Sequence, residues 1–80
     1  MQQSDEFGTL QRLVDYLYKQ RRSVARLDVL LAAEMFDISG DLLEIVELLP
    51  PGSYSRQKLC DQLNSALAAH GWGLVYGTVD

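Results

Sequence analysis

Cys60 and His70 are the single cysteine and the single histidine of this 80-residue chain, and as residue types they could form a nucleophile and its base. Both fall in one predicted helix, ten residues apart. That spacing separates them by about 15 Å along the helix axis and by about 80° around it. A catalytic pair must lie within hydrogen-bonding distance. We therefore expect no catalytic residue and no enzymatic activity, with Cys60 beside the core as a small apolar residue.

Metal and cofactor sites are not expected either. One cysteine and one histidine supply too few soft ligands for a zinc site. Glu44 and Glu47 could take part in acid–base chemistry, but they are predicted to lie on a solvated helix face. A glycine-rich nucleotide-binding loop lies directly before a helix. The glycines near the end of this chain lie after a predicted helix, and no helix is predicted after them; they are Gly71, Gly73 and Gly77. The sequence predicts no metal and no cofactor.

The charges of the chain are separated along the sequence, although the net charge is only -4. A basic cluster without an intervening acid comprises Lys19, Arg21, Arg22 and Arg26. Six acids follow, with no base among them, namely Asp28, Glu34, Asp37, Asp41, Glu44 and Glu47. The chain is therefore electrostatically bipolar, and its two regions could orient one protein against another.

Most of the reactive and charged side chains are predicted to lie on helices. Apolar residues recur at spacings of three and four along most of the sequence, which is the helical pattern. We predict helices over about 5–22 or 9–22, 24–36, 41–49 and 56–70, with Ser23 and Ser55 as N-caps and Gly71 as the last stop. Residues 72–79 alternate as a strand does, and no other strand is predicted. The expected fold class is mainly α, a compact four-helix domain with helix-turn-helix-like elements and a short C-terminal β-strand. It is a single small domain over 1–80, with a disordered N-terminus over 1–5 and a strand or tail over 72–80.

The predicted core comes from the inward stripes of the last three long helices. Its members are Leu27, Leu31, Ile45, Val46, Leu59, Leu63 and Leu67. The helix over 24–36 carries two apolar rows on different sides. A helix that is apolar on two sides is expected to lie centrally in a bundle.

Nucleic-acid binding is the alternative function, because part of the sequence has the residue spacing of a DNA-binding motif. Residues 33–39, followed by Leu43 and Val46, resemble the spacing of a helix-turn-helix, and a terminal strand would suit a winged helix. The would-be recognition helix carries acids and no base, so it would repel phosphates. The helix after Ser55 is the better candidate, with contacts from Arg56, Gln57, Lys58, Gln62 and Asn64.

A protein-interaction function is the preferred hypothesis. Contacts are expected from Tyr16, which falls opposite the apolar stripe of its helix, and from Trp72, Leu74 and Tyr76 in the tail. The predicted strand has no partner strand in the sequence, so it either pairs with the same segment of a second copy or folds back on its own bundle. We expect a small non-catalytic interaction or regulatory module that self-associates as a homodimer or binds another protein.

The cytoplasm is the expected location. A single cysteine forms no internal disulfide. The first residues carry acids where a signal peptide carries bases, and Asp28 and Glu34 interrupt the longest apolar stretch. No membrane association is expected.

Overall fold

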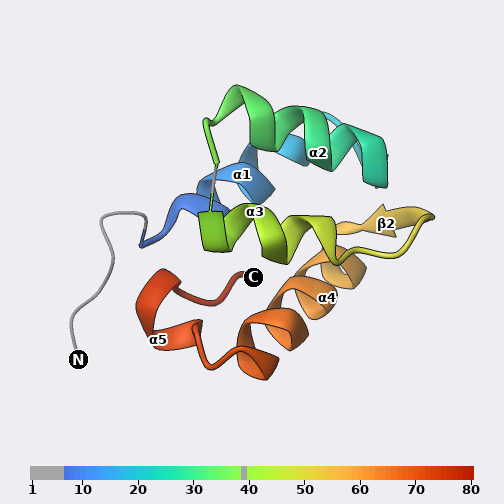
Figure 1. Ribbon diagram of the computed structural model, residues 1–80. Coiled ribbons are helices and arrows are strands. Elements are labelled where there is room, and N and C mark those ends of the chain that lie inside the picture. The colour runs from blue at the N-terminus through green and yellow to red at the C-terminus, as the bar shows by residue number, and fades with distance from the viewer. Residues whose placement is uncertain (1–6, 39) are drawn as a thin grey trace.

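The computed structural model describes residues 7–38 and 40–80, and helices dominate it. The body consists of four helices, which are α1 (Thr9–Leu17), α2 (Arg26–Met35), α3 (Gly40–Glu47) and α4 (Arg56–Ala69). A four-residue helix, α5 (Gly73–Tyr76), follows α4, and two short strands, β1 (Ser23–Ala25) and β2 (Ser53–Ser55), lead directly into α2 and α4 (Figure 1). The predicted mainly α class with four helices is confirmed, and the structure also contains a short two-stranded sheet. The predicted disordered segment, 1–5, lies outside the described residues.

The two strands form an antiparallel pair that the sequence analysis did not predict. Val24 pairs with Tyr54 at the centre of the register, and both side chains are buried. The flanking residues of both strands are exposed. Three residues are too few for an alternation to stand out from helical spacing. The pair brings the starts of α2 and α4 together, although 30 residues separate them in sequence.

The helix boundaries follow from this pairing and from local capping. Ser55 is the N-cap of α4 as predicted, because its hydroxyl accepts a hydrogen bond from the Lys58 backbone N–H at 3.2 Å. The predicted Ser23 cap of α2 is wrong, since Ser23 lies in β1 and Ala25 is the N-cap. The Asp28 carboxylate accepts from the Ala25 N–H at 2.8 Å, which satisfies a donor that the helix leaves unpaired.

The core forms where α1, α2, α3 and α4 meet. The predicted burial of Ile45, Val46, Leu59, Leu63 and Leu67 is confirmed. The predicted burial of Leu27 and Leu31 is wrong, because α2 turns the opposite side, with Val29, Ala32 and Ala33, toward the core. α2 is also not central. α3 contacts both α2 and α4, and Figure 1 shows α2 along the outer edge, above α3.

The C-terminal segment does not form the predicted strand. Gly71 adopts a left-handed backbone conformation (φ +68°) and ends α4 there, as expected, while residues 73–76 turn into α5. The chain then folds back so that Val79 is buried, and the C-terminus returns toward the middle of the molecule (Figure 1). Side chains of the bundle, rather than a second strand, bond the backbone of Val79 and Asp80. Strand pairing between two copies therefore loses its basis, and the fold-back alternative is the one observed.

None of the described helices is long and apolar enough to cross a lipid bilayer.

Candidate functional site

Large apolar side chains are exposed along one side of α2 and on the adjoining part of α1. We call Tyr16, Leu27, Leu31 and Met35 the apolar face; their exposed fractions are 44%, 63%, 53% and 66%. The three α2 residues are spaced by four, so they lie in one row on the helix surface. Tyr16 joins this row, because its hydroxyl lies 3.6 Å from the Met35 sulfur. A continuous apolar patch of this kind on a small domain is typical of a binding surface.

A groove of about 430 Å³ runs beside the apolar face, between α1 and α2. Its lining comprises Tyr16, Leu17, Lys19, Gln20, Arg21, Asp28, Leu31, Ala32 and Met35. Leucine, methionine and tyrosine side chains thus share one concave surface with two cations. The groove lies where α1 ends at Leu17, and residues 19–21 of the connection to β1 contribute to its lining.

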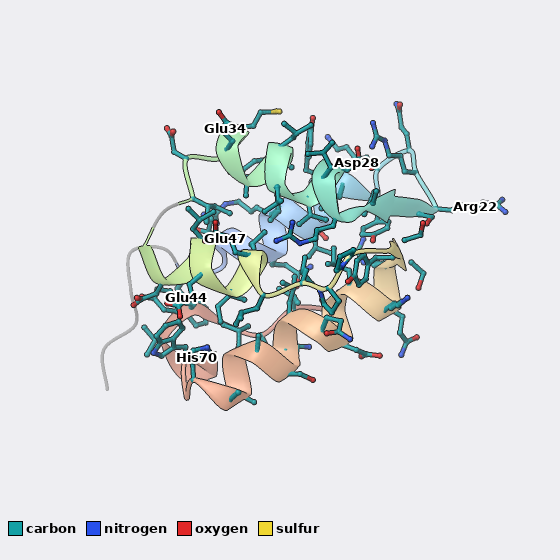
Figure 2. The ribbon with its side chains drawn as sticks, turned by 45° about the vertical axis from the view of Figure 1, so that its right-hand side comes forward. Arg22, Asp28, Glu34, Glu44, Glu47 and His70 are labelled. Atoms are coloured by element: carbon teal, nitrogen blue, oxygen red, sulfur yellow. The ribbon has the colours of Figure 1, made fainter. Side chains whose placement is uncertain are left out.

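Two cations, Lys19 and Arg21, line this groove, and a third, Arg22, is the next residue in the chain. Lys19, Arg21 and Arg22 are exposed, and Arg22 projects from the end of the molecule in Figure 2. Arg21 forms an ion pair with Asp28 at 3.4 Å. Among the described residues, neither Lys19 nor Arg22 forms an ion pair. These two charges therefore remain available to a partner.

Arg26 does not join that group of exposed cations, although it belongs to the same cluster in the sequence. Its guanidinium donates to the Leu49 carbonyl at 2.6 Å and to the Glu47 carbonyl at 3.0 Å. Carbonyls at the end of a helix have no partner within the helix. Arg26 thus supplies donors to the end of α3.

A second surface, on α3, carries the opposite charge. We call Asp41, Glu44, Glu47 and Leu48 the acidic face; all four residues are exposed, Leu48 to 53%. A groove of about 220 Å³ adjoins Leu48, between α3 and α4. Figure 2 places Glu44 and Arg22 toward opposite ends of the molecule. Glu44 and Arg22 are therefore separated in space, whereas Asp28 of the acidic region lies beside Arg21.

The structure places the predicted contact residues in two different settings. Tyr16 belongs to the apolar face. Trp72 and Tyr76 are partly buried against the core, with their rings in an edge-to-face contact at 6.0 Å. The Tyr76 hydroxyl donates to the Asp41 carboxylate at 2.9 Å, which ties α5 to α3. The Leu74 side chain lies outside the described part of the structure.

Two residues proposed for nucleic-acid contacts, Arg56 and Lys58, are engaged within the chain. Arg56 donates to the Asp15 carboxylate at 2.5 Å and to the Asp80 carbonyl at 2.9 Å. Lys58 donates to the Ser53 carbonyl at 3.2 Å and lies 5.1 Å from the centre of the Tyr54 ring.

Asn64, also a predicted nucleic-acid contact, instead bonds the backbone of Val79. Gln57 and Gln62 are exposed, and Gln62 lines the groove beside Leu48. Arg56, Lys58 and Asn64 of α4 therefore bond β2 and the C-terminal segment of the same chain.

The Arg56–Asp15 contact predicts an acid-dependent property. Hydrogen bonds from Arg56 and from Gln11 hold the pKa of the Asp15 carboxyl below its usual value of 3.8. A carboxyl whose pKa is lower in the folded chain stabilises the fold above about pH 3.8, and this stabilisation is lost as the pH falls through the folded-state pKa. We expect an NMR titration of the Asp15 carboxyl carbon to give a midpoint below 3.8.

The matched variant for this titration is Arg56→Gln, which removes the largest cause of the shift. The Asp15 midpoint is expected to rise toward 3.8 in that variant. A parent midpoint at or above 3.8, or a midpoint unchanged by the substitution, would contradict the ion pair in solution.

Cys60 and His70 lie at opposite ends of α4. Cys60 is buried in the first turns, and this burial raises the pKa of its thiol. His70 is the C-cap residue and stacks on Trp72, with the ring centres 4.5 Å apart. Within residues 7–38 and 40–80, no three His, Cys, Asp or Glu side chains are grouped so that they could hold a metal ion.

The exposed row of Leu27, Leu31 and Met35 on α2 is the part of the apolar face that the sequence does not predict. The sequence predicts Leu27 and Leu31 to be part of the core, whereas the structure exposes both. The two apolar rows of this helix could have indicated an exposed apolar surface, because a helix at the edge of a small bundle buries only one such row. Comparisons with protein-family models, with curated proteins and with solved structures find no match to this chain.

Proposed function

We propose that this chain is a non-catalytic protein-interaction module whose binding surface is the apolar face together with the cations beside it. The observation that carries the proposal is the exposure of Leu27, Leu31 and Met35 in one row on α2. Burying apolar surface against a partner contributes roughly 25 cal/mol per Å². A partner that covers this row therefore gains the main driving force for association in water.

The partner that fits best is a protein segment with apolar side chains flanked by carboxylates. The groove supplies the apolar wall through Leu31 and Met35, and Lys19 and Arg21 lie at its side. Opposite charges at the rim of an apolar contact guide association and set its orientation. An amphipathic helix laid along α2 would meet the row with its own residues at the same spacing.

The absence of catalysis in this proposal is supported by the placement of the reactive side chains. Cys60 is buried at one end of α4 and His70 is exposed at the other end. A nucleophile and base must lie within hydrogen-bonding distance of each other. A cytoplasmic location also suits the module, because its one cysteine has no second cysteine in the chain.

Two synthetic amphipathic helices, each about five turns long, test the proposal. Both carry the same leucine stripe, flanked by glutamates in one peptide and by lysines in the other. The glutamate peptide is expected to shift the backbone NMR signals of α2 and of residues 16–21, and the lysine peptide is not, because Lys19 and Arg21 line the groove. Leu31→Glu is expected to weaken binding at least about tenfold.

Ala69→Glu provides the matched control, since it adds the same charge at an exposed position of α4. Binding of the glutamate peptide to this variant is expected to be unchanged. Equal shifts with both peptides, or shifts that survive Leu31→Glu, would overturn the proposal. Added duplex DNA that shifts the signals of Arg56 and Lys58 in a salt-sensitive way would favour the nucleic-acid alternative instead.

A further inference from the structure

We infer that the partner of the apolar face is the acidic face of a second copy of this chain, so that copies associate head to tail. This inference rests on the proposed function and names its partner. The required partner carries an exposed apolar side chain among carboxylates. Leu48 has those properties, because it is 53% exposed and lies one helical turn after Glu44, with Glu47 as its neighbour in sequence.

The two surfaces carry opposite charges, and the first of them contains a groove that can accept an apolar side chain. The groove beside α2 is concave and apolar at Leu31, Ala32 and Met35, which suits an inserted leucine side chain. With Leu48 of one copy in the groove of another, the carboxylates beside it come near the cations at the groove's edge. Of the residues that the structure describes, Glu44 and Glu47 are in no ion pair, so their charges are available for Lys19 and Arg22 of that second copy.

The two surfaces also have no residue in common, so one copy can use both at once. The apolar face belongs to α1 and α2, and the acidic face belongs to α3 and the residue after it. Figure 2 shows Arg22 and Glu44 well apart. A contact between two unlike surfaces leaves one of each unused in every dimer. Association therefore continues into a ring or an open chain, unlike a symmetric dimer, which stops at two copies.

The contact is expected to be weak and dependent on concentration. A stable interface buries about 1,200–2,000 Å² in total and involves about 20–30 residues on each side. The apolar face and the acidic face offer four named residues each, with a few cations beside the first. Dissociation constants in the micromolar range or weaker are therefore expected, and added salt is expected to weaken the contact further.

Two blocking variants of the full chain test this geometry. Leu31→Glu disables the apolar face and Leu48→Glu disables the acidic face; both leucines are exposed, so both variants are expected to fold. In sedimentation velocity, the parent is expected to exceed twice the 9.0 kDa mass of one chain as its concentration rises. Each variant is expected to stay monomeric. An equimolar mixture of the two is expected to form a dimer and nothing larger, because it contains one intact pair of surfaces.

The control for the added charge is again Ala69→Glu, which is expected to associate as the parent does. A parent that stays monomeric at about 1 mM would overturn the inference, as would a mixture that stays monomeric. Association that survives Leu48→Glu but not Leu31→Glu would indicate a symmetric contact and would also overturn it. The proposed function stands if the parent is monomeric and the glutamate peptide still binds the apolar face; it fails if that peptide does not bind.

Discussion

Leu63→Ala is expected to lower the free energy of unfolding by about 2–5 kcal/mol. Leu63 is fully buried on the inward side of α4. Its truncation removes apolar contacts and leaves a cavity that the surrounding side chains fill only in part. The total stability of a folded domain is about 5–15 kcal/mol. Urea unfolding followed by circular dichroism measures the loss, which is a large fraction of that total.

Leu31→Ala is the matched control, since it is the same substitution in a different helix, α2. Leu31 is largely exposed, so the free energy of unfolding is expected to change by no more than about 0.5 kcal/mol. The comparison is made at low protein concentration, where self-association does not contribute. Equal losses in the two variants would show that the orientation of α2 described above is wrong.

Asn64→Ala is expected to lower the free energy of unfolding by about 1–3 kcal/mol. The Asn64 amide donates to the Val79 carbonyl at 2.8 Å, and its carbonyl oxygen accepts from the Val79 N–H at 2.8 Å. One side chain thus satisfies both backbone groups of a buried residue, as a neighbouring strand would do. Hydrogen exchange of the Val79 amide is expected to become faster in the variant, because the C-terminal segment detaches.

A double-mutant cycle distinguishes this role from a general effect on α4. In a chain truncated before residue 77, Asn64 has no Val79 to bond, so Asn64→Ala is expected to cost little further stability. Gln57→Ala, at an exposed position of the same helix, is expected to be neutral in both backgrounds. The same loss on Asn64→Ala with and without the C-terminal segment would contradict the proposed contact.

Part of the candidate site could be predicted from residue types and positions. Tyr16 falls opposite the stripe of α1, and the basic and acidic regions follow directly from the order of the residues. Arg26 belonged to the basic region in sequence, yet it is bound to carbonyls at the end of α3. Whether a charged side chain is available to a partner depends on neighbours distant in sequence. The order of charged residues therefore locates the basic and acidic regions, but it does not show which charged side chains are free to contact a partner.

Local sequence was sufficient for the features that arise within a few residues. The Ser55 cap and the stop at Gly71 are local features, and the apolar stripe of α4 is visible in the sequence as a spacing of three and four residues. Packing between residues distant in sequence determined the strand pair, the orientation of α2 and the path of the C-terminal segment. The β1–β2 pair joins Val24 to Tyr54, and the choice between the two apolar rows of α2 depends on where α3 lies. The C-terminal segment has strand-like composition, but residues 73–76 bond their backbone within α5 and Asn64 bonds the backbone of Val79. The segment therefore folds onto the bundle without forming a strand.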